Sequence, residues 1–241
     1  MLKFSTAVSI AFLAAISGCT PPGESLIRKG HERGSARAEQ GDLSVASLSS
    51  LDGPTQAILQ AYGGSIREHA REYGFDWRLV LAVMKQESRF SPEAESHKGA
   101  EGLMQIMPRT GEEITKALSI EDIDHPHQNI RAGVYYLSRL YQMFENVPEG
   151  DRIRLTLAAY NAGIGRVYDA QVLAAYLQDN PTKWQSVRDA LPLLSKRYYT
   201  LHASVWKDKR PEAGWFGSSG QTIAYVERVM DYYEDYRAVL N

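Results

Sequence analysis

The segment DWRLVLAVMKQES, residues 76–88, decides the fold class. Asp76 is a residue type that caps helix N-termini, and Val80, Val83 and Met84 follow at spacings of three and four. This spacing predicts a helix through Gln86 with one apolar face. Segments with the same period continue on both sides, and no stretch sustains the period of two that is typical of a half-buried strand. We therefore expect an all-α fold with little or no sheet.

Helical spacing recurs from residue 55 onward. Before Asp76 it predicts a helix that Gly74 ends, and Pro108 is in the position where a later helix would begin. The apolar positions of these two helices and of a long helix after them are Leu59, Tyr62, Ile66, Ala70 and Tyr73, then Ile114 and Leu118, then Ile130, Val134, Leu137, Tyr141 and Phe144. Further helices are expected at 152–161, 165–178, 192–202 and 222–239.

The composition is that of an ordinary globular protein. The chain has 241 residues, 44% hydrophobic, with 27 Lys and Arg against 29 Asp and Glu. The charge shows no basic excess of the kind that indicates a nucleic-acid partner, and a single Cys excludes a disulfide framework and a Cys-based zinc site. We expect His125 and His127 to lie in a loop, with no metal and no cofactor, because no third ligand follows at helical spacing.

The first 18 residues have the pattern of a signal peptide. Residues 5–16 are mostly apolar, and the stretch is too short to span a bilayer. The sequence from Ile16 to Cys19 resembles a bacterial lipobox, which implies that Cys19 is acylated and anchors the chain to a lipid bilayer. Thr20 occupies the position where a signal for retention in the inner membrane typically has Asp, so we expect the periplasmic face of the outer membrane. A plain secretory signal is the alternative. Residues 19–54, rich in Gly, Ser and charged residues, are interpreted as a flexible tether, and 55–241 as the catalytic domain.

Glu87 is a carboxylate on an apolar helix face. It follows Met84, Val83 and Val80 by three, four and seven residues, so it shares their face. Burial there would raise its pKa and keep it protonated near neutral pH, as the general acid of a glycosidic cleavage requires. An exposed Glu in the last turn, or one paired with Arg89, is the simpler alternative.

Two later segments carry neutral hydrogen-bonding groups beside glycines. Gly99 and Gly102 precede an apolar run that contains Gln105, and Tyr160 and Asn161 come just before Gly163. Such groups suit a sugar polymer, whose hydroxyl and N-acetyl groups need hydrogen bonds.

Taken together, these segments resemble the lytic transglycosylases of the soluble-lytic-transglycosylase type (glycoside hydrolase family 23), over residues 60–241. The stretch between Gly165 and Tyr225 is most similar to a membrane-bound branch of that family. The matching segments, in order, are Glu87–Phe90, Ser96–Pro108, Asn129–Ile130 with Gly133, Ala159–Gly163 and Tyr225–Val229.

The resemblance implies a lysozyme-like helical domain of the goose type that cleaves peptidoglycan glycan strands. Glu87 would be the sole catalytic acid and base, and the product a 1,6-anhydromuramic end formed without water. The same matching implies that Ser96 and Tyr225 orient the muramic N-acetyl group and that other residues shape the sugar subsites, namely Met104, Gln105, Tyr160 and Asn161.

Two alternatives stay open. A second carboxylate from Glu93, Glu95 or Glu101 would make the chain a hydrolytic muramidase. A lipoprotein that binds peptidoglycan without catalysis is the other. At Gln221 and Ile164 the family often has Glu and Pro. These two departures concern the shape of the sugar subsites and do not involve Glu87.

Overall fold

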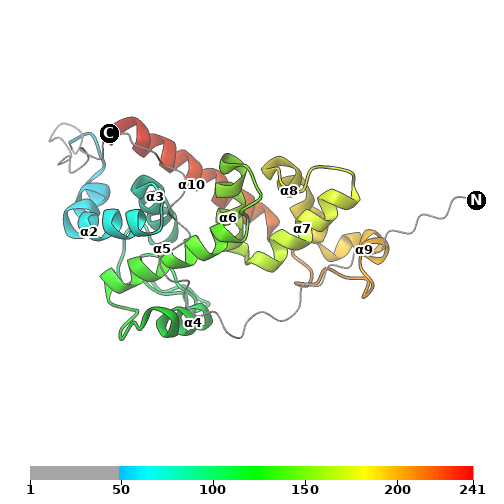
Figure 1. Cartoon of the computed structure of the whole chain (residues 1–241), viewed down its shortest axis with the longest axis horizontal. Helices are drawn as coiled ribbons and strands as arrows, with labels where there is room; N and C mark the ends of the chain where they lie inside the picture. Colours follow the sequence, from blue (N-terminus) through cyan, green and yellow to red (C-terminus); the bar gives the residue numbers. More distant parts are fainter. Residues whose placement is uncertain (1–48, 241) are drawn as a thin grey trace, which may run out of the picture. The chain divides into compact units, whose positions relative to one another are not determined.

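The computed structural model describes residues 49–240, and every regular element in that range is helical (Figure 1). The expected all-α class is thus confirmed. Extended pairing in this range is limited to isolated bridges that link Glu95 to Glu101 and Glu101 to Ile106. The predicted signal peptide, Cys19 and most of the predicted tether lie outside the described residues. The elements are α2 (Gly53–Glu72), α3 (Trp77–Ser88), α4 (Pro108–Leu118), α5 (Pro126–Gln142), α6 (Glu149–Ala162), α7 (Ile164–Tyr176), α8 (Trp184–Ala190), the 3₁₀ helices η1 (Leu191–Leu194) and η2 (Lys196–Tyr198), α9 (Tyr199–Val205) and α10 (Ser219–Val239).

Side-chain caps begin the first two helices. Asp52 accepts a hydrogen bond of 2.8 Å from the Thr55 amide, so α2 starts at Gly53, inside the stretch interpreted as tether. Asp76 caps α3 as expected, by accepting from the Arg78 amide at 2.9 Å. Arg89 ends α3 in the left-handed conformation, with φ 52°. The end of α3 next to Glu87 is therefore fixed by backbone geometry.

The predicted helix over 192–202 is wrong in detail. Pro192 falls in the first turn of η1, and Ser195 is extended with ψ 143°, so the backbone breaks before η2 and α9. Sequence spacing also missed α8, a short helix whose Trp184 and Val187 are buried. His127 lies in the first turn of α5, not in a loop, because Pro126 starts that helix.

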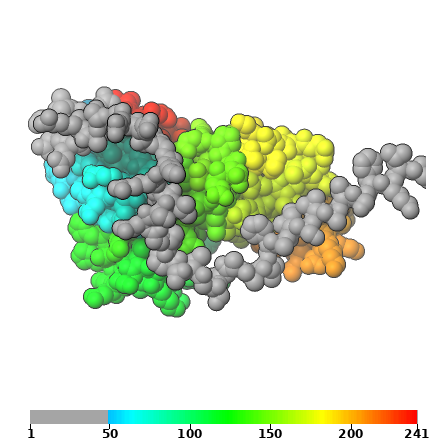
Figure 2. Space-filling model, viewed as in Figure 1, coloured from blue at the N-terminus to red at the C-terminus, as the bar shows by residue number. Residues whose placement is uncertain are grey.

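The helices pack around one apolar core, and α3 lies within it. Val80, Val83 and Met84 have no exposed surface, as their shared face predicted. In Figure 2, the surface of α6 (yellow-green) lies between those of α2 (cyan) and α7 (yellow). No helix among the described residues combines the length and the apolar character needed to cross a membrane.

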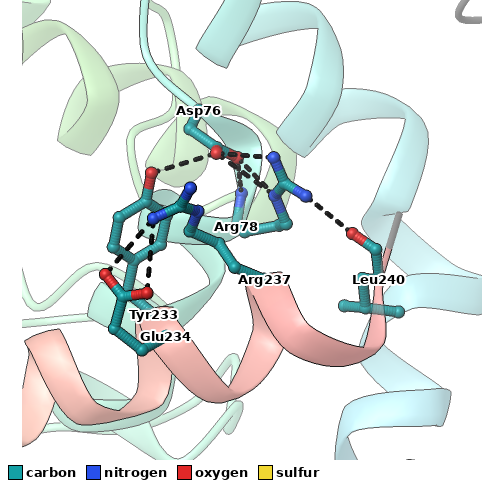
Figure 3. Close-up of polar contacts among 6 residues, drawn as sticks. All are labelled: Asp76, Arg78, Tyr233, Glu234, Arg237 and Leu240. Carbon is teal, nitrogen blue, oxygen red and sulfur yellow. Dashed lines mark hydrogen bonds and ion pairs between the residues drawn. The ribbon is translucent and has the colours of Figure 1, made fainter.

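Helices α3 and α10 pack antiparallel along their lengths. At the start of α3, the Tyr233 hydroxyl donates to Asp76 at 3.0 Å, and an Arg78 Nη donates to the Leu240 carbonyl oxygen at 2.8 Å (Figure 3). At the other end, Arg228 Nε donates to Gln86 Oε1 at 3.1 Å. These bonds set the register that places the last turn of α3 beside the first half of α10.

Candidate active site

Glu87 and Tyr225 meet where α3 and α10 pack together. The Tyr225 hydroxyl donates a hydrogen bond of 2.6 Å to Glu87 Oε1. Tyr225 is buried, whereas Glu87 keeps a partly exposed side chain above the fully buried Met84. The carboxyl group is therefore held by the Tyr225 hydroxyl, while part of the Glu87 residue stays exposed.

Burial raises the pKa of Glu87 to about 7, although the Tyr225 hydrogen bond lowers it. No neighbouring carboxylate contributes to this rise, and within residues 49–240 Glu87 takes part in no ion pair, with Arg89 or any other residue. At neutral pH a large share of Glu87 is thus protonated and able to donate a proton.

A second tyrosine adjoins Glu87 and lines a cavity. The Tyr160 hydroxyl donates to the Met104 carbonyl oxygen at 2.7 Å, and its ring lies 5.3 Å from the ring of Tyr136. Burial and the charge of Glu87 raise the pKa of Tyr160 well above its usual value, which keeps it neutral. The cavity is about 300 Å³ in volume, and its lining includes Lys98, Gln105, Met107, Thr110, Tyr136, Tyr160 and Asn161.

The loop between α3 and α4 is held under this cavity by Asn129 of α5. Asn129 Oδ1 accepts from the Met104 amide at 2.8 Å, and Nδ2 donates to the Glu101 and Ile123 carbonyls. Gly102, with φ 76°, passes so close that an added Cβ would lie 2.5 Å from Asn129 Nδ2. Two of the matched family positions are thus explained by close packing.

Three of the predicted subsite residues have part of their bonding capacity committed within the protein. Met104 is fully buried and does not line the cavity. Its backbone amide donates to Asn129 Oδ1, and its carbonyl oxygen accepts from the Tyr160 hydroxyl. The Gln105 amide nitrogen donates to the Ala94 and Gly102 carbonyls at 2.8 and 3.1 Å, which leaves its oxygen for a ligand. Asn161 Oδ1 accepts from Thr222 at 2.8 Å, which leaves the amide nitrogen. Each of the last two offers one defined hydrogen-bonding group.

Ser96 closes a turn of its own loop. Its Oγ accepts from the Ala100 amide at 2.9 Å and from the Lys98 amide at 3.3 Å. The structure therefore brings Glu87, Tyr160 and Tyr225 together, whereas the bonds of Ser96 stay local. The sequence interpretation missed Tyr136, Met107 and Thr110 of the cavity lining; each occupies an ordinary helical or loop position with no distinguishing pattern.

The three acids considered as a second carboxylate differ from Glu87 in their exposure. Glu93, Glu95 and Glu101 are exposed. Among the described residues, no cluster of three or more His, Cys, Asp or Glu is arranged to hold a metal ion.

Comparison with known proteins agrees with this geometry. The model of the transglycosylase SLT domain matches residues 64–182. Membrane-bound lytic murein transglycosylase F of Desulfosudis oleivorans is 38% identical over 171 residues, which are 70% of this chain and 35% of that protein. The Yersinia enterocolitica protein of the same name is 39% identical over 154 residues, 63% of this chain and 30% of its own. The chain thus spans about a third of the length of these relatives.

Two solved structures share the fold. An inactive mutant of lytic transglycosylase Slt from Pseudomonas aeruginosa has a TM-score of 0.53 and 26% identity, covering 77% of this chain and 26% of that one. The 70 kDa soluble lytic transglycosylase Slt70 of Escherichia coli has the same TM-score and identity, with 79% and 26% coverage. The described residues thus have the lysozyme-like helical fold expected for the family. Through residues 64–182, this chain belongs to the SLT family of lytic transglycosylases.

Proposed function

We propose that this domain is a peptidoglycan lytic transglycosylase that cleaves the β-1,4 bond between N-acetylmuramic acid and N-acetylglucosamine. The observation that carries the proposal is Glu87, an acid whose pKa burial raises to about 7 with no second carboxylate contributing. The names of the relatives, lytic murein transglycosylases, support the same substrate.

In this mechanism Glu87 works first as an acid and then as a base. It gives its proton to the bridging oxygen as the bond from that oxygen to C1 of muramic acid breaks. The resulting carboxylate then takes the proton of the muramic C6 hydroxyl while O6 bonds to C1. The carboxyl group ends as it began, water is not consumed, and the product carries a 1,6-anhydro ring.

The surrounding residues suit this sequence of proton transfers. The hydrogen bond from Tyr225 stabilises the carboxylate that exists between the two transfers. The cavity beside Tyr160 offers the Gln105 oxygen and the Asn161 amide nitrogen to a sugar's hydroxyl and N-acetyl groups. The attacking hydroxyl belongs to the same ring as C1, so proximity favours it over water.

The test is digestion of purified sacculi, followed by mass spectrometry of the released fragments. We expect anhydro-muropeptides from the wild type and none from Glu87→Gln, while Glu93→Gln, an exposed matched control, keeps full turnover. Reducing fragments, heavier by one water, would indicate a hydrolytic muramidase. Binding to sacculi without release would indicate a pure binding protein.

We also propose that Cys19 is acylated and holds the domain at the periplasmic face of the outer membrane. The lipobox-like sequence at residues 16–19 supports this, and the relatives are named membrane-bound. Cys19→Ala should move the protein from the membrane fraction to the soluble periplasm. Retention of that variant in the membrane fraction would overturn the anchor.

A further inference from the structure

Thr222 is a buried residue of α10 whose hydroxyl group bonds to another helix. It is 1% exposed, and its Oγ1 donates a hydrogen bond of 2.8 Å to Asn161 Oδ1 near the end of α6. A hydroxyl group has one proton, so this bond uses its whole donor capacity. A Thr inside a helix commonly bonds to a carbonyl of its own preceding turn, whereas Thr222 reaches across to a residue of the cavity.

One side of α10 serves both the proposed acid and the cavity. Thr222 and Tyr225 are three residues apart, so their side chains lie on the same side of the helix. Tyr225 donates to Glu87 Oε1 at 2.6 Å, and Thr222 donates to Asn161 one turn earlier. Tyr160, which directly precedes Asn161, is close enough to Glu87 for the charge of that carboxylate to raise its pKa. Helix α10 therefore holds side chains at two points of one site.

The bond from Thr222 determines which end of the Asn161 amide is left for a ligand. An amide has an acceptor oxygen and a donor nitrogen, and its partners set which of them faces which way. Asn161 is exposed and lines the cavity, and its oxygen is held by Thr222, so its nitrogen remains. Gln105 has the opposite arrangement, because its nitrogen is committed to two carbonyls. These two side chains thus present one donor and one acceptor to the cavity.

We propose that Thr222 is a positioning residue for substrate binding: its hydroxyl holds Asn161 so that Nδ2 donates to an acceptor oxygen of the bound sugar. The inference rests on the proposed function, since the glycan is then the ligand of this cavity. The acceptor is an N-acetyl carbonyl or a hydroxyl oxygen, and both accept from an amide nitrogen. Without the Thr222 hydroxyl the amide can turn, so binding of the sugar has to order it again.

The first test measures KM and kcat on soluble, peptide-free glycan strands. Thr222→Val replaces the hydroxyl by a methyl group, and it should raise KM about tenfold without changing kcat. Thr222→Ser keeps the hydroxyl and should return KM to near the wild-type value. Thr156→Val is the matched control: Thr156 is also buried, and its hydroxyl donates to the Arg152 carbonyl within α6, so KM should not change. An unchanged KM in Thr222→Val, or no recovery in Thr222→Ser, would overturn the assignment.

The second test asks whether Thr222 acts through Asn161. Asn161→Ala should raise KM to a similar extent, and adding Thr222→Val should cause no further rise, because the partner is already gone. The alkaline limb of the pH–rate profile should not move in Thr222→Val, since the bond from Tyr225 to Glu87 is kept. If the two effects on KM multiply, or if the limb moves, Thr222 acts through the general packing of α10 and the assignment is wrong.

Strands from which the N-acetyl groups have been removed identify the acceptor oxygen. A rise in KM that Thr222→Val shows on acetylated strands alone assigns the N-acetyl carbonyl, and an equal rise on both kinds of strand assigns a hydroxyl. Each of these results supports the role of Thr222, and no rise on either kind of strand contradicts it.

A binding measurement separates this proposal from the proposed reaction. In a Glu87→Gln background, Thr222→Val should weaken binding of the same strands about tenfold, as measured by isothermal titration. If the wild type does not cleave the strands but this loss of affinity is found, the role of Thr222 stands and the reaction falls. If the wild type cleaves them and Thr222→Val changes neither affinity nor KM, the reaction stands and the role of Thr222 falls.

Discussion

Glu87 Oε1 accepts a hydrogen bond from the hydroxyl of Tyr225, a residue 138 positions later in the chain. The apolar surroundings raise the pKa of the carboxyl group, and this one bond works against them. The balance leaves a pKa of about 7, close to the value that serves both donation and acceptance of a proton at neutral pH.

The rate should fall with rising pH because the reaction begins with protonated Glu87. We expect kcat/KM on soluble glycan strands to decline above about pH 7, by a factor that approaches ten per pH unit. A pH–rate profile between pH 5 and 9 measures this. A decline that already begins near pH 4.5, the ordinary value for Glu, would show that the carboxyl group is not shielded in solution.

Tyr225→Phe should raise the pKa of Glu87 further, because it removes the bond that stabilises the charged form. The alkaline limb of the profile should move upward, and kcat should fall by about 10- to 100-fold because the carboxylate formed during the reaction loses a partner. Tyr233→Phe is the matched control on the same helix, since its hydroxyl contacts Asp76 at the far end of α3. Tyr233→Phe should lower the free energy of unfolding and leave the alkaline limb of the pH–rate profile where it is in the wild type.

Glu87→Gln should stabilise the fold in a pH-dependent way. The folded-state pKa of about 7 lies above the ordinary 4.5, so the folded protein holds a proton that the unfolded chain releases. The wild type therefore loses stability as pH rises through this window, and the variant does not. The gain in unfolding free energy should grow by about 1–3 kcal/mol between pH 4.5 and 8, as measured by denaturant titration. An equal gain at both pH values would contradict the shielding of Glu87.

Gly133→Ala should separate α5 from the loop that it supports. An added Cβ would lie 2.5 Å from Met104 Cβ, so the loop must shift. We expect a loss of about 1–3 kcal/mol in unfolding free energy and a higher KM, because Met104 also accepts the Tyr160 hydroxyl beside the cavity. Gly64→Ala, where nothing lies within 4 Å of the new Cβ, should keep KM unchanged and stability at least equal.

Local spacing predicted the parts of this fold that depend on a single segment. The apolar face of residues 80–84 and the cap at Asp76 are both present, because a helix face and an N-cap are set by residues within a turn or two. The placement of Glu87 against that face follows from the same spacing.

Features that depend on two distant segments were not accessible in this way. No spacing relates Tyr225 to Glu87, and only the family resemblance pointed to Tyr225. Likewise, no local pattern shows that the Gln105 amide nitrogen is already committed to loop carbonyls, or that Met104 is enclosed by Asn129, Gly133 and Tyr160. The succession of η1, η2 and α9 in place of one helix depends on Pro192 and on an extended Ser195.

The antiparallel packing of α3 and α10 makes the raised pKa of Glu87 depend on an intact fold. The pKa of Glu87 is raised only while α3 and α10 are packed together. Separation of the two helices would expose the carboxyl group to water and remove the hydrogen bond from Tyr225. A misfolded, nicked or half-denatured copy would carry only an ordinary glutamate there. Under the proposed function, damage that separates the two helices would therefore remove the proton donor, and a damaged copy would not cleave the sacculus.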